Sequence, residues 1–305
     1  MDPYFRDGWD DIVAAWGREK ATERLFNLAP VVFRPDALVA RSIERGLKVI
    51  GDLGFVPIAH RIFRYNRLSV REGWRYQLNI ATRDRIDVMD MIMPASDSLY
   101  IVMKRTSATS RVPATTRLSS CKGPSLPEHR EPHHLRRLLG VAQVSVLTYV
   151  HISDEPADIV RELGIFFDRT DRLEILRAIE TEEKATQAIE RAAKQLYSTI
   201  PPHNIQFADA LDRIEQAAAQ LLSTHHEIAR LCSRIRHGTS RDWRRLLALI
   251  DAAPISVDHW DRVAVAASLA EKHFDAPTII PDVSELDWDG TETEPEFDRG
   301  TASHV

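Results

Sequence analysis

The sequence predicts a protein in two parts, an α/β or α+β sandwich followed by an all-helical region. Between about residues 30 and 170, short apolar runs alternate with amphipathic helical patterns, which is typical of a sheet covered by helices. After about Thr170 the apolar runs stop and only helical periodicity remains. A length of 305 residues agrees with two domains, at roughly 150 residues per domain.

The elements of the first part follow in order along the chain. Residues 1–27 are expected to form a helical lead-in, because apolar side chains recur there at roughly helical spacing: Phe5, Trp9, Ile12, Val13, Trp16, Leu25 and Phe26. Apolar runs predict strands at 31–33, 55–63, 99–103 and within 141–150. Helices are expected near 37–53 and over 156–167. We therefore place the sandwich domain at residues 28–170.

The second part consists of amphipathic segments at 171–197, 205–236, 240–252 and 256–273. In the clearest of them, apolar residues fall on one broad stripe: Ile205, Phe207, Leu211, Ile214, Ala218, Leu221, Leu222, Ile228 and Leu231. This pattern predicts an all-α domain over 171–275. The tail at 276–305 is acidic and poor in apolar residues, so we expect it to be disordered.

Composition and charge narrow the classes of function. With 44% hydrophobic and 28% charged residues, the chain has the composition of an ordinary soluble globular protein. A net charge of -5 argues against a nucleic-acid partner, because phosphate backbones are bound by basic surfaces. Cys121 and Cys232 are far apart, so no disulfide framework is expected and a reducing compartment is indicated.

The same patterns argue against export and against a membrane. The N-terminus carries acids where a signal peptide has a basic region followed by an apolar core. The longest nearly apolar stretch, 138–150, is 13 residues long, whereas a membrane helix needs about 20. We expect a cytoplasmic protein without a membrane partner.

The densest chemical signal surrounds His151. This histidine leaves an apolar run just before Ser153 and Asp154, polar residues that can cap a following helix. Glu162 lies 11 residues later. If the helix folds back beside the strand, its carboxylate holds the Nδ1 proton of His151 and leaves Nε2 free to attack. The arrangement suits phosphoryl transfer through a phosphohistidine, and a buried or capping histidine is the alternative.

Blocks at 33–37, 53–55, 99–104, 123–136 and 151–162 together resemble the nucleoside diphosphate kinase family, in the family's order. The first reads Phe-Arg-Pro-Asp-Ala, against an apolar residue and Lys-Pro-Asp-Ala in the family. The fourth reads Gly-Pro-Ser-Leu-Pro, then after four residues Pro-His-His-Leu-Arg, against Gly-x-Thr-x-Pro and Pro-Gly-Thr-Ile-Arg. The last matches His-Gly-Ser-Asp with a glutamate 11 residues on.

The resemblance implies a ferredoxin-like α+β sandwich that moves the γ-phosphate of an NTP, through a phosphohistidine, to a nucleoside diphosphate or related acceptor. Residue by residue, it implies a catalytic pair and two further groups. The catalytic pair is His151 and Glu162; nucleotide and phosphate ligands are Arg34, Ser125, Arg136, Arg117 and Thr148; supporting residues are Trp74, Ser153 and Asp154. Magnesium is expected with ATP or another NTP, held by the phosphates without a metal site on the protein, and homo-oligomers are expected.

Several positions depart from the family pattern. Arg34 replaces a lysine, Trp74 a tyrosine, Thr148 an asparagine and Ile152 a glycine, while Arg117 lies two residues out of register. Arginine and lysine are not equivalent at a phosphate site, because the planar fork does not occupy the space of an ammonium. A second hypothesis therefore stays open, in which the chain is a catalytically impaired nucleotide-binding sensor or scaffold that acts on a protein partner through its helical domain.

Overall fold

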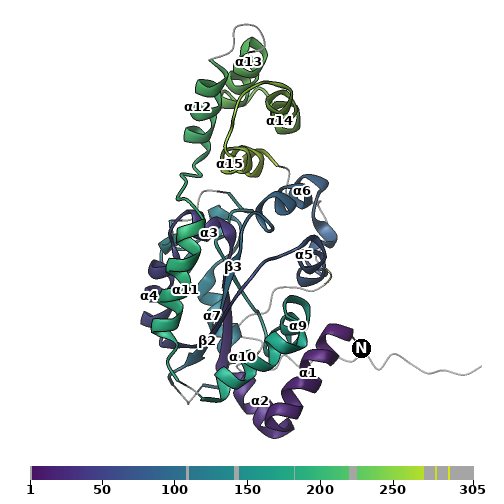
Figure 1. Ribbon diagram of the computed structural model, residues 1–305, viewed down its shortest axis with the longest axis vertical. Helices are drawn as coiled ribbons and strands as arrows, with labels where there is room; N and C mark the ends of the chain where they lie inside the picture. Colours follow the sequence, from purple (N-terminus) through teal and green to yellow (C-terminus); the bar gives the residue numbers. More distant parts are fainter. Residues whose placement is uncertain are drawn as a thin grey trace, which may run out of the picture.

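The computed structural model describes residues 2–107, 110–140, 144–181, 183–219, 225–270, 279 and 288. At its centre is an antiparallel sheet of β1 (Leu28–Phe33), β2 (Phe55–Phe63), β3 (Ser98–Arg105) and β4 (Val150–Ile152), in the order β2-β3-β1-β4. Helices cross from β1 to β2 and from β3 to β4 (Figure 1). This is the ferredoxin-like strand order, so the expected α+β sandwich is confirmed and the α/β alternative is wrong.

The helices that surround the sheet and extend beyond it are α1 (Pro3–Trp16), α2 (Arg18–Asn27), α3 (Pro35–Val39), α4 (Ile43–Asp52), α5 (Arg67–Gly73), α6 (Arg83–Ile92), α7 (Ala114–Lys122), α8 (Leu135–Leu138), α9 (Pro156–Phe166), α10 (Arg169–Thr181), α11 (Thr186–Thr199), α12 (Phe207–Ala218), α13 (His225–Arg236), α14 (Trp243–Ala252) and α15 (His259–Leu269). Short 3-10 turns, η1 (Leu78–Ile80) and η2 (Pro127–His129), lie in the connections. The helix expected near 37–53 is thus two helices, α3 and α4.

The N-terminal lead-in is a pair of helices that holds α9 in place. Gly17 separates α1 from α2 in a left-handed conformation with φ of 74°, which glycine adopts without a steric penalty. Gly8 of α1 and Gly164 of α9 lie where the two helices meet, and a Cβ on either would collide with a backbone carbonyl of the other. This close packing fixes α9, the helix that carries Glu162.

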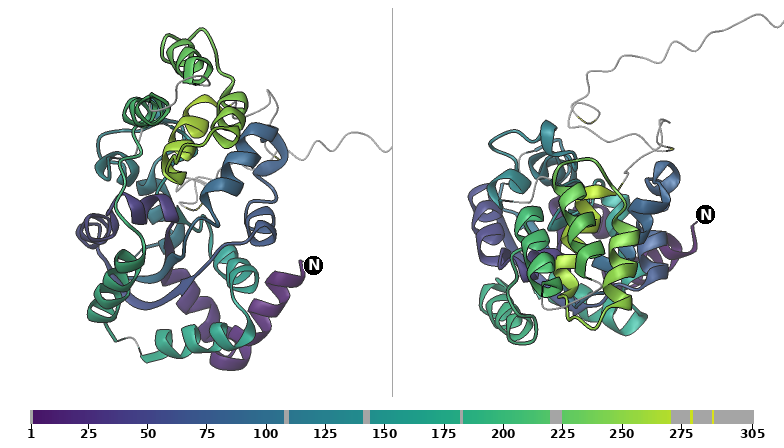
Figure 2. Two further views of the ribbon diagram at one scale, coloured as in Figure 1. Left: turned by 45° about the horizontal axis from the view of Figure 1, so that its top comes forward. Right: turned by 90° about the horizontal axis from the view of Figure 1, so that it is seen from above.

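The boundary of the helical domain differs from the predicted one. Helix α10 packs on β2 and α1, and α11 packs on β2, β3 and α3, so both belong to the sheet domain. Helices α12 to α15 pack on one another and form a separate bundle, called the bundle below, at one end of the molecule (Figures 1 and 2). The predicted start at residue 171 is too early, because amphipathic periodicity shows that a face is buried but not which surface buries it.

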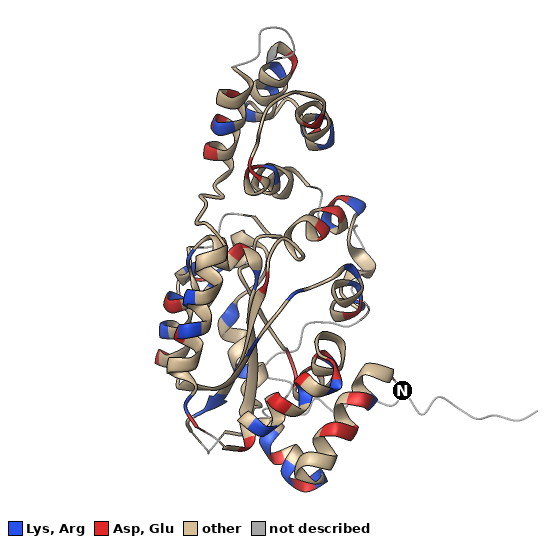
Figure 3. Cartoon of the chain, in the orientation of Figure 1, with Lys and Arg blue, Asp and Glu red and all other residues tan. Residues whose placement is uncertain are grey.

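The remaining observations concern the distribution of charge, the length of the helices and the tail. Basic and acidic residues alternate along the described elements (Figure 3). None of the helices in the described residues is long and apolar enough to span a membrane. The tail predicted at 276–305 lies outside the described residues except for Ile279 and Trp288.

Candidate active site

The short strand β4 is held by an unusual turn immediately before His151. Tyr149 adopts a left-handed conformation with φ of 62°, which is uncommon for a residue with a side chain. The backbone N–H of Tyr149 donates to Oδ2 of Asp36 at 3.0 Å, and its carbonyl accepts from the N–H of Arg34 at 2.9 Å. These contacts tie the turn to the end of β1, which pairs with β4 and places Val32 opposite His151.

The guanidinium of Arg34 completes this support. Its Nε donates to Oδ1 of Asp36 at 3.1 Å, Nη1 donates to the hydroxyl of Thr148 at 2.6 Å, and Nη2 donates to the carbonyl of Val146 at 2.9 Å. Both members of the Arg34–Asp36 pair are buried. Two residues expected to bind phosphate, Arg34 and Thr148, thus bond to each other and brace the segment that leads into β4.

His151 and Glu162 are in direct contact. Nε2 of His151 lies 2.6 Å from Oε1 of Glu162, and the hydroxyl of Ser153 donates to Oε2 of Glu162 at 2.7 Å. An ionised carboxylate only accepts hydrogen bonds, so His151 carries its proton on Nε2 and keeps a lone pair on Nδ1. The two side chains thus meet as expected, but through Nε2 and not through the expected Nδ1.

Trp74 packs against the imidazole. The two rings meet edge to face, with centroids 4.9 Å apart and an interplanar angle of 67°. Tyr76, two residues along the chain from Trp74, packs elsewhere: Cζ of Arg161 lies 5.3 Å from the centre of its ring. The support that Trp74 gives to His151 is therefore ring packing.

A cavity of about 360 Å³ opens beside His151 and Trp74. Its polar lining includes three arginines together with hydroxyl-bearing residues: Arg34, Arg85, Arg136, Ser125, Ser145 and Thr148. An apolar wall is formed by Leu78, Ile80, Met89, Leu126, Val146 and Val150. The cavity thus combines a cationic side next to the histidine with a surface suited to an apolar or aromatic group.

The arginines of this cavity form a buried group of like charges. Burial, together with the neighbouring cations Arg34 and Arg130, lowers the pKa of Arg136 to about 9. Nη1 of Arg136 donates to the carbonyl of Gly123 at 2.6 Å, while Nε has no partner within the described structure. Burial and Arg34 also lower the pKa of Arg85, to about 10. Such a cluster is stabilised by an anion.

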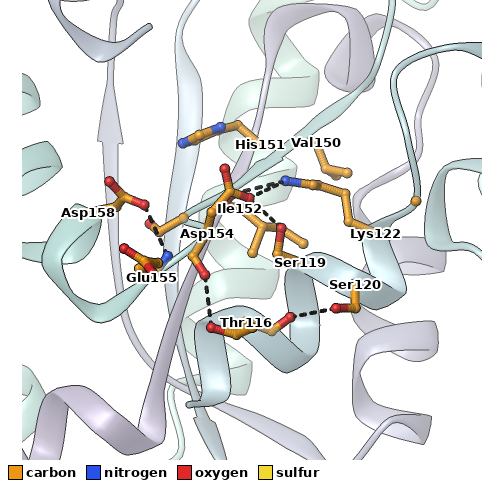
Figure 4. Close-up of polar contacts among 12 residues, drawn as sticks. Thr116, Ser119, Ser120, Lys122, Val150, His151, Ile152, Asp154, Glu155 and Asp158 are labelled. Carbon is orange, nitrogen blue, oxygen red and sulfur yellow. Dashed lines mark hydrogen bonds and ion pairs between the residues drawn. The ribbon is translucent and has the colours of Figure 1, made fainter. Parts of the chain in front are cut away.

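Asp154 follows β4 and joins a polar cluster with α7 (Figure 4). Its Oδ1 accepts from the hydroxyl of Ser119 and from Nζ of Lys122, the latter at 3.0 Å. Nζ of Lys122 also donates to the carbonyl of Ile152 at 3.2 Å. Burial acts to raise the pKa of Asp154, but the Lys122 cation and the Ser119 hydroxyl hold it at about 2. Asp154 thus reaches the strand residue after His151 only through Lys122, which bonds to both, and its supporting role stays a prediction.

Ile152, which replaces the glycine of the family pattern, is fully buried. Successive side chains of a strand point to opposite faces, so the side chain of Ile152 lies on the face opposite His151. The space in front of the imidazole is therefore not taken by Ile152.

The structure brings most of the predicted site residues together and leaves one apart. Arg117 lies exposed on α7 and does not line the cavity. Arg85 lines the cavity but is not predicted from the sequence, because residues 80–95 do not follow the family pattern. The available signal is its spacing from Met89: four residues apart, the two lie on one helix face. No cluster of three or more possible metal ligands occurs among the described residues.

No protein-family model matches the sequence, and no curated protein matches it. Among solved structures, the nucleoside diphosphate kinase of Aquifex aeolicus aligns with 47% of this chain and 96% of its own, at 18% identity and a TM-score of 0.39. That of Encephalitozoon cuniculi aligns over 46% and 87%, at 16% identity and 0.38. A Halobacterium salinarum nucleoside diphosphate kinase, in complex with CDP, aligns over 47% and 88%, at 16% identity and 0.38. The likeness to these nucleoside diphosphate kinases is one of fold and covers about half of the chain.

Proposed function

We propose that this chain is a phosphotransferase that passes the γ-phosphate of an NTP through His151 to a nucleoside diphosphate or a related acceptor. The observation that carries the proposal is the position of His151. Its Nε2 is bound by the buried Glu162, and its ring borders a cavity that gathers the guanidinium groups of Arg34, Arg85 and Arg136. A nucleophile oriented by a carboxylate beside a cationic cavity is what phosphoryl transfer requires.

The proposed reaction has two balanced steps. In the first, the Nδ1 lone pair of His151 forms a bond to the γ-phosphorus, the bond from that phosphorus to the β,γ-bridging oxygen breaks, and the diphosphate leaves with the electron pair. The Nε2 proton stays on the imidazole and bonds to Glu162, which stabilises the charge on the ring. In the second step, a phosphate oxygen of the acceptor attacks the phosphorus and the N–P bond breaks, returning the lone pair to Nδ1.

The charge of the phosphates is matched by the chain's own arginines. A loose phosphoryl-transfer transition state spreads negative charge over the equatorial oxygens, and positioned cations stabilise it. Arg136 and Arg85 supply such cations, while Ser125 lines the same cavity with a hydroxyl. No carboxylate lines the described cavity, so a magnesium ion would enter it on the nucleotide phosphates and would neutralise part of their charge.

The test is incubation of the purified chain with magnesium and γ-labelled ATP, followed by a search for acid-labile, base-stable label on the protein. We expect label on the wild type, none on His151→Ala, and discharge onto added nucleoside diphosphates. Transfer of the label to a different acceptor would support the phosphohistidine and change only the identity of the acceptor. Absence of label on a chain that binds ATP would rule out the transfer reaction.

A second candidate function is nucleotide binding without turnover, and the bracing role of Arg34 favours it. Nε, Nη1 and Nη2 of Arg34 all donate within the protein, to Asp36, to Thr148 and to the carbonyl of Val146. A cation held in this way contributes charge to the cavity but is not positioned to follow a moving phosphoryl group. Binding of ATP with no label on His151 is the outcome that selects this candidate.

Self-association and a protein partner for the bundle stay predictions, to be measured by light scattering and by affinity capture.

A further inference from the structure

Helix α6 presents one of its faces to the cavity. Arg85 and Met89, four residues apart, both line the cavity that also contains His151. Residues at this spacing lie on the same side of a helix. The helix is capped by Thr82, whose hydroxyl accepts from the backbone N–H of Arg85 at 3.2 Å, so the first turn that carries Arg85 is well formed.

Another face of α6 is bound by the bundle. Nη2 of Arg244 donates to Oδ1 of Asp84 at 2.5 Å, and Nη1 of the same guanidinium donates to Oδ2 of Asp87 at 2.6 Å. The indole Nε1 of the buried Trp243 donates to Oδ2 of Asp84 at 3.3 Å. Arg244 thus pairs with two carboxylates that lie about one turn apart on α6. One of them, Asp84, directly precedes Arg85 in the sequence.

The end of α6 is held by the same bundle. Nε2 of His259 lies 3.0 Å from the carbonyl of Met91, near the C-terminus of the helix. Of the described elements, α15 makes the most extensive contact with α6, and no strand of the sheet contacts it comparably. Figures 1 and 2 show α6 beside the bundle, at the end of the sheet domain that the bundle covers. The helix that supplies Arg85 therefore rests on the bundle.

We propose that Arg85 binds the phosphates of the ligand, and that Arg244 of the bundle is a positioning residue that holds Arg85 in the cavity through α6. The inference rests on the proposed function, to which it adds a phosphate-binding residue and a role for the bundle. It also makes ligand binding and the docking of the bundle mutually dependent, because a coupling between two sites is reciprocal. An agent that pulls the bundle from α6 weakens phosphate binding, and bound phosphate holds the bundle more tightly.

The test compares the affinity of full-length variants for inorganic triphosphate, a probe that has phosphates but no base. Arg85→Met removes the proposed phosphate contact, and we expect it to weaken binding by about tenfold, the range for a lost hydrogen bond to a charged group. Arg244→Ala leaves every cavity residue in place, and we expect it to weaken binding about three- to tenfold. Arg245→Ala is the matched control, because Arg245 pairs with Glu227 inside the bundle, and we expect less than about a twofold change.

A double-mutant cycle separates positioning from general destabilisation. If Arg244 acts through Arg85, then Arg244→Ala has no further effect in the Arg85→Met background, since the group it positions is gone. Independent effects that multiply in the double variant would overturn the inference. So would an Arg244→Ala variant with a lower unfolding temperature and unchanged affinity, or a wild-type chain that does not bind triphosphate. Coupled binding with no label on His151 would leave this inference standing and reject the transfer reaction alone.

Discussion

Nε2 of His151 and Oε1 of Glu162 lie 2.6 Å apart, although strand β4 carries one residue and helix α9 the other. The second oxygen of Glu162 accepts from Ser153, and both Glu162 and Ser153 are buried. The carboxylate therefore has a fixed orientation, and it fixes the proton of His151 on Nε2. In the proposed reaction, this one contact leaves Nδ1 of His151 as the attacking nitrogen.

The first prediction concerns Glu162→Gln. The amide keeps the shape of the carboxylate but can donate to Nε2 of His151, which would move the ring proton to Nδ1 and remove the attacking lone pair. We expect the rate of label incorporation from γ-labelled ATP to fall about 10- to 100-fold, the range found when a carboxylate that orients a metal-bound histidine is lost.

The control is Ser153→Ala, which removes one hydrogen bond to Glu162 and leaves the carboxylate on His151. A much smaller effect is expected from it. Equal rates in Glu162→Gln and the wild type would show that Glu162 does not set the tautomer.

The second prediction concerns Arg136→Met. Arg136 is a buried cation close to Arg34 and Arg130, so its removal relieves repulsion while its apolar replacement fills similar space. Because the carbonyls of Gly123 and Val150 also lose a donor, we expect the free energy of unfolding to fall by only about 1–2 kcal/mol. We expect triphosphate affinity to fall about tenfold or more. Calorimetric titration and urea unfolding measure the two quantities, and a large loss of stability with unchanged affinity would assign Arg136 a purely structural role.

Much of the sheet and the central contact of the site could be predicted from the sequence. The apolar runs at 55–63 and 99–103 correspond to β2 and β3. β3 is buried over most of its length, and a buried strand needs a nearly continuous apolar stretch. The spacing of 11 residues from His151 to Glu162 gave a strand end, a turn and a helix that returns along the strand. Local patterns suffice where neighbours in space are also neighbours in the chain.

What could not be predicted depends on contacts between distant segments. The amphipathic pattern of 171–197 showed that α10 and α11 each bury a face, but not that the sheet domain buries it. Arg85 reaches the cavity because the bundle holds α6, a relationship that spans about half of the chain. Arg34 has the position of a phosphate-binding residue in the sequence, yet its bonds to Asp36 and Thr148 appear only when β1 and β4 are placed side by side.

The third prediction concerns pH and the Lys122–Asp154 contact. Burial opposes ionisation of Asp154, but the Lys122 cation together with the Ser119 hydroxyl holds its pKa at about 2, below the ordinary value of about 4. Because the pKa of Asp154 is lower in the folded than in the unfolded chain, its ionised carboxylate stabilises the fold above about pH 4. This stabilisation is lost as the pH falls towards 2. We expect Lys122→Met to lower the free energy of unfolding by about 1 kcal/mol near pH 7, allowing for solvent screening of a partly exposed carboxylate, and by less near pH 3.

The matched control for this prediction is Lys194→Met, which removes an exposed lysine from α11. Urea unfolding of both variants at the two pH values gives the comparison. A deficit in Lys122→Met that stays constant across the pH range would mean that Lys122 stabilises the fold by packing and by its bond to the Ile152 carbonyl, without its charge.

The fourth prediction concerns Arg34→Lys, which restores the residue that the family pattern has at this position. A lysine keeps the positive charge, but its single nitrogen cannot reach Asp36, Thr148 and the Val146 carbonyl together, as the guanidinium does. Buried acceptors would lose their donors, and we expect the free energy of unfolding to fall by about 2–4 kcal/mol.

The effect of Arg34→Lys on catalysis follows from the same contacts. The segment before β4 contains Tyr149 in its left-handed conformation, and it depends on Asp36 and Arg34 to stay there. Loosening it displaces His151, so we expect labelling by γ-labelled ATP to decrease despite the return to the family residue. Thr148→Ala serves as the comparison, because it removes one of the same bonds, and the two changes together should be less than additive. A folded Arg34→Lys variant with faster labelling would show instead that Arg34 restrains a competent histidine, and that the chain is a binding protein derived from an enzyme by this substitution.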